Sequence, residues 1–106
     1  MRRLTQEEVK TFADYLCFTE QEAYEITELF FNEKERGNYR MKYTELETLD
    51  DYIHEWECDW YRYSSWEQLV ESENEQNEGL TEEDLEKLKG FAVFFLSTGM
   101  IVQAVV

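Results

Sequence analysis

The sequence predicts an α+β fold, in which several amphipathic helices pack on a small, mostly antiparallel sheet with a C-terminal β-hairpin. Apolar residues recur at three- and four-residue spacing in several segments, which is the spacing of one buried helix face. The uncharged C-terminal segment is instead rich in β-branched residues and contains a glycine turn. With 106 residues, 42% of them apolar, the chain is predicted to form a single compact acidic domain, residues 1–106.

Two helices are predicted in the first third of the chain, each opened by a capping box. Thr5 with Glu8 forms the first box, and Thr19 with Glu22 forms the second. Gly37 is predicted to end the second helix. The predicted buried faces consist of Val9, Phe12, Ala13 and Leu16 in the first helix and Ala23, Ile26, Leu29 and Phe30 in the second.

A short strand and a third helix are predicted next. Residues 39–43 alternate with period two, which predicts a strand with Tyr39, Met41 and Tyr43 pointing inward. A helix is then predicted from Glu45 to Cys58. Its apolar face is predicted to consist of Leu46, Leu49, Ile53, Trp56 and Trp60.

The last third is predicted to hold two short helices and the hairpin. Ser64 and Glu67 form a capping pattern before the first helix, which carries Trp66, Leu69 and Val70, and residues 71–78 are predicted to be a solvated loop. The second helix is predicted to start after Thr81, to carry Leu85 and Leu88, and to end at Gly90. The hairpin strands are predicted at residues 91–96 and 100–106, with Gly99 in the left-handed position of the turn.

Several features predict a cytoplasmic protein. The uncharged C-terminal segment of 16 residues is shorter than the roughly 20 residues that a membrane helix needs. Arg2 and Arg3 are not followed by an apolar run, so no signal peptide is predicted. Cys17 and Cys58 are far apart and fit a reducing compartment.

The net charge of −15 is concentrated in one segment. Residues 44–86 hold 16 acidic residues and one basic residue, Arg62. Residues 1–43 hold nine acidic and seven basic residues, and residues 87–106 hold two basic residues and no acidic one. Because such a concentration of like charge weakens a compact state, we expect it to serve a basic partner, such as a protein that holds nucleic acid.

One row of acidic residues in this segment has helical spacing. Glu47, Asp51, Glu55 and Asp59 recur every four residues, which places a carboxylate about every 6 Å along one helix face. Such a row coarsely imitates the periodic charge of a nucleic-acid strand. The predicted partner-binding acidic residues are Glu47, Asp50, Asp51, Glu55, Glu57, Asp59, Glu67 and Glu71. A solvated acidic face that only keeps the protein in solution is the alternative.

Aromatic residues cluster beside these acids. Trp56 and Trp60 lie on the predicted apolar helix face and are expected in the core. Tyr61, Tyr63 and Trp66 are predicted to belong to the partner-binding surface, since exposed Tyr and Trp side chains anchor many protein interfaces.

The sequence predicts neither an enzyme nor a cofactor. His54 and Cys58 are four residues apart and share a helix face, but the further ligands of a zinc site are missing. The single histidine has no evident nucleophile with an orienting acid, and no glycine-rich phosphate loop occurs. No basic patch supports direct binding of nucleic acid.

In character, the chain resembles small acidic anti-defence proteins of phages and mobile elements, namely anti-CRISPR and anti-restriction nucleic-acid mimics. The resemblance lies in the row from Glu47 to Asp59 and in the acidic run from Glu71 to Glu86. It implies a non-enzymatic inhibitor that blocks the basic groove of a nucleic-acid-binding effector or nuclease, in the cytoplasm of a host cell. No family motif carries the resemblance.

Two other interpretations stay open. The chain is also similar in character to bacterial immunity proteins, which would make it the neutralising partner of a basic nuclease toxin. A homodimeric interaction module is the other interpretation, in which an unpaired edge of residues 100–106 pairs with a second copy.

Overall fold

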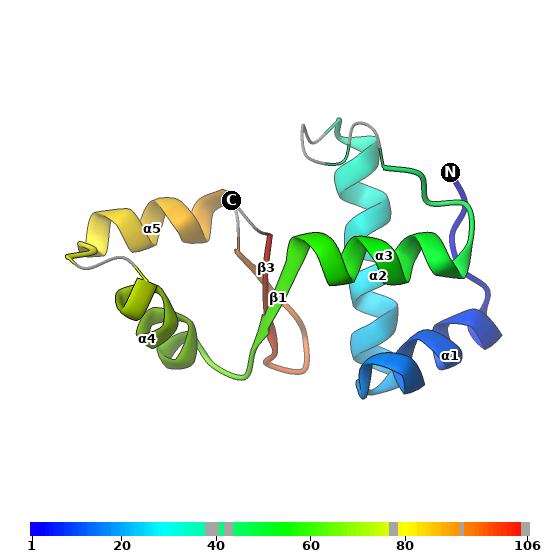
Figure 1. Ribbon diagram of the computed structural model, residues 1–106, viewed down its shortest axis with the longest axis horizontal. Coiled ribbons are helices and arrows are strands. Elements are labelled where there is room, and N and C mark those ends of the chain that lie inside the picture. Colours follow the sequence, from blue (N-terminus) through cyan, green and yellow to red (C-terminus); the bar gives the residue numbers. More distant parts are fainter. Residues whose placement is uncertain (38–40, 42–43, 77–78, 92, 105–106) are drawn as a thin grey trace. The chain divides into compact units, whose positions relative to one another are not determined.

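The computed structural model of the protein confirms the α+β class. It describes the whole chain apart from residues 38–40, 42–43, 77–78, 92 and 105–106. Within the described part, five helices and one three-stranded antiparallel sheet form the regular structure (Figure 1). Whereas the sequence predicts one domain, the contacts gather in two compact units, Met1–Cys58 and Asp59–Val106, which are described in turn.

The first unit opens with two helices that begin at the predicted capping boxes. The Thr5 hydroxyl accepts the backbone N–H of Glu8, whose carboxylate accepts the backbone N–H of Thr5, and α1 (Gln6–Leu16) follows. Thr19 and Glu22 repeat this arrangement at the start of α2 (Glu20–Glu35).

The buried faces of α1 and α2 agree closely with the predicted ones. Leu16 and Leu29 are only half-buried. Gly37, at φ +74°, follows α2 in the left-handed conformation that its predicted role requires. The predicted positions that are buried are Val9, Phe12 and Ala13 in α1 and Ala23, Ile26 and Phe30 in α2.

The third helix, α3 (Leu49–Asp59), begins four residues later than predicted. The Asp51 carboxylate accepts the backbone N–H groups of Glu47 and Thr48, each at 3.0 Å. The Thr48 hydroxyl in turn accepts the backbone N–H of Asp51. These bonds form a cap at Thr48, so the helix starts there and not at Glu45.

The buried face of α3 is also rotated from the predicted one. Tyr52 and Glu55 are its buried residues, whereas Leu49, Ile53 and Trp56 are half-buried. The prediction that Trp56 is a core residue is therefore wrong.

Tyr52 takes the central place in the core of the first unit. It is 0% exposed, its ring stacks on Phe30 at 6.3 Å between centroids, and its hydroxyl donates to the backbone oxygen of Arg2. Burial raises the pKa of the Tyr52 hydroxyl to about 12.

The strand predicted at residues 39–43 falls mostly outside the described residues. Met41, which is described, is buried as predicted, but its backbone lies in a 3₁₀ turn.

The second unit contains the sheet. Its strands are β1 (Trp60–Tyr63), β2 (Val93–Phe95) and β3 (Ile101–Ala104), in the order β1-β3-β2. Trp60 pairs with Ala104, and Val93 pairs with Gln103. The sequence did not predict β1, because its aromatic residues continued the spacing of the preceding helix. Aromatic residues also favour strands, and the pairing with β3 makes this segment a strand.

The C-terminal hairpin is confirmed. The backbone N–H of Leu96 donates to the oxygen of Met100 at 2.9 Å, and Gly99 adopts φ +91° in the turn. Because β3 pairs with β1 on one side and with β2 on the other, residues 101–103 have no unpaired edge. The expectation that this run pairs with a second copy is therefore wrong for these residues.

Two helices accompany the sheet, α4 (Trp66–Gln76) and α5 (Glu82–Phe91). Ser65, and not Ser64, caps α4, because its hydroxyl accepts the backbone N–H of Gln68. The helix runs through residues 71–76, where a loop was predicted, since glutamate and glutamine are good helix formers.

The start of α5 is as predicted, but its end is not. Thr81 and Asp84 exchange the two hydrogen bonds of a capping box. Asp84 thereby gains a backbone hydrogen bond that lowers the pKa of its carboxyl. The helix ends at Phe91, one residue after the predicted Gly90.

Both helices face the same side of the sheet (Figure 1). Leu69 of α4, Val93 of β2 and Ile101 of β3 form a buried core cluster on this side of the sheet, and Leu88 of α5 packs against it. Among the described residues, no helix combines the length and the apolar character needed to span a membrane.

Candidate functional site: an acidic groove between α4 and α5

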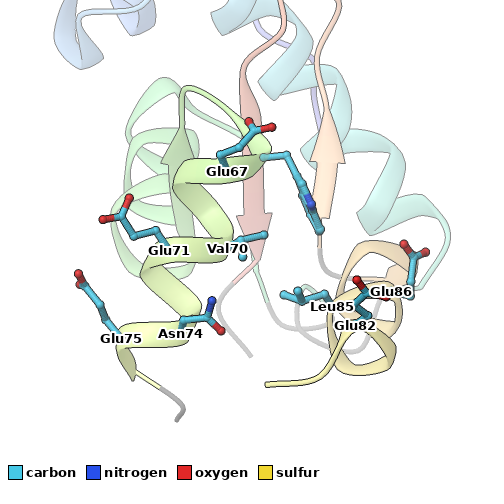
Figure 2. Close-up of a pocket in the computed structure, with 9 residues that line it drawn as sticks. Glu67, Val70, Glu71, Asn74, Glu75, Glu82, Leu85 and Glu86 are labelled. Atoms are coloured by element: carbon cyan, nitrogen blue, oxygen red, sulfur yellow. The ribbon is translucent and has the colours of Figure 1, made fainter. Parts of the chain in front are cut away.

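A groove of about 840 Å³ lies between α4 and α5 in the second unit. Its apolar part is formed by Trp66 and Val70 from α4 and by Leu85 from α5. Figure 2 shows Val70 and Leu85 pointing toward one another across the space between the two helices. These side chains are only half-buried, so the groove presents an accessible apolar floor.

Helix periodicity explains why the floor is exposed. Leu69 and Leu88 point to the sheet and enter or border the core. Val70 is the next residue after Leu69, so it is turned about 100° around α4 away from the core, whereas Leu85 shares the face of Leu88 but lies one turn nearer the start of α5, where it lines the groove.

Five glutamates surround this floor, and all five are exposed. Within the part of the chain that the structure describes, none of them accepts a hydrogen bond or forms an ion pair. Asn74 lines the groove with them. The five are Glu67, Glu71 and Glu75 on α4 and Glu82 and Glu86 on α5.

The basic residues of α5 make other contacts. Lys87 forms an ion pair with Glu83 at 3.6 Å. Lys89 places its ammonium 5.6 Å from the ring centroids of Trp66 and Phe95. The charges of the groove glutamates are therefore not compensated by these two lysines, and successive carboxylates on α4 repel one another at i,i+4 spacing.

The acidic row predicted on the third helix is not one exposed surface. Glu47 lies before α3 and contacts the N-terminal amine. Asp51 caps the helix, and the backbone N–H of Glu47 is the main cause of the lowered pKa of its carboxyl. Glu55 is 3% exposed, and the Thr44 hydroxyl donates to its carboxylate at 3.3 Å. The row is thus interrupted by residues that serve the first unit itself.

The remaining acidic candidates on α3 have varied surroundings. Asp50 is exposed and Asp59 is half-buried. The Tyr15 hydroxyl donates to the Glu57 carboxylate at 2.6 Å, and this bond raises the pKa of Tyr15. These three residues do not line the groove.

Among the three aromatic candidates, only Trp66 lines the groove. Its ring lies 6.2 Å from that of Phe95. Tyr61 is exposed on β1, and Tyr63 packs against the core of the second unit. Of the predicted partner-binding residues, the groove brings together Trp66, Glu67 and Glu71.

His54 and Cys58 lie close together, as their spacing predicts. The Cys58 sulfur is 3.6 Å from His54 Nε2, and both side chains are exposed. Among the described residues, no group of three or more histidine, cysteine or acidic residues is arranged to hold a metal ion.

The predicted site omitted several groove residues. Val70 and Leu85 were predicted only as apolar residues of the two short helices, and both belong to the groove floor. Glu75, Glu82 and Glu86 were recognised only as part of an acidic run. Glu75 lies four residues after Glu71, and Glu86 lies four residues after Glu82, and this spacing was the available signal. The predicted loop over residues 71–78 concealed it for Glu75.

Comparisons with known proteins give no relatives to set beside this geometry. No family model matches the chain, and no curated protein or solved structure matches it.

Proposed function

We propose that the protein is a non-enzymatic inhibitor that binds the nucleic-acid-binding groove of a basic effector or nuclease, as anti-CRISPR and anti-restriction proteins do. The observation that carries the proposal is the set of five exposed glutamates around the groove between α4 and α5, for which the described part of the chain supplies no partner. Repulsion between like charges destabilises the helices that carry them, so the lysines and arginines of a partner would reduce this repulsion on binding.

The α4 series also has the geometry that the proposal needs. Glu67, Glu71 and Glu75 are each four residues apart on one continuous helix, so their Cα atoms rise about 6 Å from one to the next. Such a regular row of carboxylates coarsely imitates the periodic negative charge of a nucleic-acid strand. A basic groove that holds phosphates at such intervals is therefore a suitable partner, and contact would release the same bound anions that nucleic acid displaces.

The proposed surface differs from the row first expected on the third helix. Reversing the charge of Asp51 or Glu55 would remove a helix cap or place a cation in a buried position. Loss of activity in such variants would report unfolding as well as lost contact. Charge changes on α4 and α5 avoid this ambiguity because the groove carboxylates make no internal bonds among the described residues.

The test is inhibition of DNA cleavage by a panel of purified CRISPR effectors and restriction endonucleases. We expect the protein to inhibit at least one of them at about 50 mM salt, and expect the inhibition to weaken at least tenfold by about 200 mM. Inhibition of none of these enzymes, or inhibition that does not depend on salt, would contradict the proposal.

A matched pair of triple variants separates the groove from bulk charge. Glu67→Gln, Glu71→Gln and Glu86→Gln together remove three charges from the groove. The control replaces three exposed glutamates of the first unit, Glu7, Glu20 and Glu35, with glutamine. We expect only the groove variant to lose inhibition; equal losses would assign the effect to net charge alone.

A further inference from the structure

The groove between α4 and α5 has two chemically different parts, and a purely electrostatic contact would use only one of them. Carboxylates alone would suffice to imitate phosphates. Val70 and Leu85 nevertheless leave apolar surface open between the two helices (Figure 2), and Trp66 lines the same groove. An accessible apolar strip between two charged rims is typical of a surface that receives an amphipathic segment.

The dimensions of the groove favour a helix as the occupant. Its walls are helices of 11 and 10 residues. The lining residues of α4 run from Trp66 to Glu75, a rise of about 14 Å, which corresponds to between two and three turns of a helix lying along α4. The volume of about 840 Å³ accommodates several side chains of such a helix. Apolar residues spaced at i and i+4 on the occupant would match the spacing of Trp66 and Val70 on α4.

The charge of the rims determines the character of the occupant. Three glutamates on α4 and two on α5 flank the floor from both sides. A second copy of this chain, with its net charge of −15, is repelled by these rims. A helix with an apolar ridge between two rows of lysine or arginine is attracted to both rims and to the floor.

We infer that the groove between α4 and α5 binds an amphipathic basic helix of the partner protein. The apolar ridge of that helix packs on Val70 and Leu85, and its lysine or arginine side chains pair with the flanking glutamates. The inference rests on the proposed function for the basic character of the partner, and it adds that recognition requires an apolar anchor as well as charge.

The test compares two synthetic 18-residue helical peptides in calorimetric titrations against the full chain. One carries leucine at i, i+4 and i+7 with flanking lysines, and the other has glutamine at the leucine positions and the same charge. We expect the leucine peptide to bind at least about tenfold more tightly. Equal affinities would overturn the inference.

Substitutions in the groove floor test whether the difference in affinity between the two peptides arises in the groove. Val70→Gln and Leu85→Gln are each expected to reduce the preference for the leucine peptide about tenfold and to leave the affinity for the glutamine peptide unchanged. Tyr24→Gln is the control, since Tyr24 is an exposed aromatic residue of the first unit. If the preference survives both floor substitutions, or falls equally in the control, the inference is wrong.

A further variant, at an exposed position outside the core, is expected to gain affinity. Asn74 lines the groove and is exposed, so Asn74→Leu extends the apolar floor by about one turn beyond Val70. We expect this variant to bind the leucine peptide several-fold more tightly than the unchanged protein does. No gain, or an equal gain for the glutamine peptide, would count against the inference.

Two outcomes distinguish this inference from the proposed function. If the nuclease panel is inhibited but the peptides bind equally, the function stands and the helix-binding groove does not. If no nuclease is inhibited but the peptide preference and its loss in the floor variants are observed, the groove stands and the proposed function does not. Displacement of the leucine peptide by spermidine at equal charge concentration would indicate a small-polycation site and would overturn the inference.

Discussion

The two units of this protein have nearly equal net charges but use their acidic residues differently. The first unit has 15 acidic and seven basic residues, and the second has ten acidic and three basic ones. In the first unit, Glu8 pairs with Arg2, Glu28 pairs with Arg3, and Glu22 caps a helix. In the second unit, five groove glutamates have no such role within the described residues. Net charge therefore does not distinguish the two units, whereas the internal partners of their acidic residues do.

The difference follows from where basic groups lie in the fold. The N-terminal segment of the first unit contacts α3 and the residues before it: the backbone N–H of Arg2 donates to the oxygen of Leu46, and the Tyr52 hydroxyl donates to the oxygen of Arg2. This places two arginines and the terminal amine among the acidic residues of that unit. The α4 helix of the second unit contains no lysine or arginine, and it ends without a basic residue in its last turn. Glu67, Glu71 and Glu75 consequently have no lysine or arginine on their own helix.

The largest predicted effect tests whether Tyr52 is the core residue on which the first unit depends. Replacing Tyr52 with alanine should lower the free energy of unfolding by about 3–5 kcal/mol, because it empties a fully buried aromatic position. Tyr52→Phe should cost only about 1 kcal/mol, since it loses the hydrogen bond to Arg2 and keeps the ring. Urea unfolding followed by near-ultraviolet circular dichroism measures both values.

Trp56 supplies the comparison for that measurement. Its side chain is half-buried and meets Phe18 edge-to-face at 5.2 Å between centroids. We expect Trp56→Ala to cost clearly less than Tyr52→Ala. A larger cost for Trp56→Ala would show that the sequence-based core was right and the rotated face of α3 wrong.

A smaller effect, the pH dependence of the free energy of unfolding, tests the contrast between paired and unpaired glutamates. Hydrogen bonding by the Arg2 guanidinium lowers the pKa of Glu8 to about 2, from an ordinary value of 4.5. Because the folded pKa is depressed, Glu8 contributes stability above pH 4.5, and this contribution is lost as the pH falls from about 4.5 through about 2. Glu8→Gln should therefore lower the free energy of unfolding at pH 7 by about 1 kcal/mol, the modest size expected of a partly exposed pair.

Denaturant unfolding at pH 7 and pH 2 checks the sign. The gap between the unchanged protein and Glu8→Gln should shrink at the lower pH. Glu71→Gln is the comparison from the second unit, and it should not destabilise the protein at pH 7 because Glu71 has no internal partner among the described residues. A constant gap for Glu8→Gln at both pH values would refute the role of the ion pair.

Local sequence signals predicted much of the fold. Three capping threonines, Thr5, Thr19 and Thr81, mark helix starts correctly, because a cap is a bond between residues three positions apart. The turn at Gly99 was predictable for the same reason. The start of α3 was not, since the competing cap formed by Thr48 and Asp51 lies inside a segment that also has helical periodicity.

The candidate site was less predictable because two acidic series look alike in the sequence. The series from Glu47 to Asp59 and the series from Glu67 to Glu75 both repeat every four residues. They differ only in what the side chains meet, such as the Thr44 hydroxyl at Glu55. Contacts of this kind depend on the packing of whole elements, so spacing alone does not reveal which carboxylates are available to a partner.

The smallest predicted effect tests the central contrast most directly, because the two units should respond with opposite signs. Glu71 lies four residues from both Glu67 and Glu75, so Glu71→Lys converts two repulsive i,i+4 pairs into attractive ones and should raise the free energy of unfolding by about 0.4–1 kcal/mol. Glu28→Lys instead removes the partner of Arg3 and should lower it by about 0.5–1 kcal/mol. Both changes should shrink in 1 M salt, where charges are screened beyond about 3 Å. If Glu71→Lys destabilises the protein as Glu28→Lys does, the groove glutamates have internal partners after all, and the case for an external basic partner loses its support.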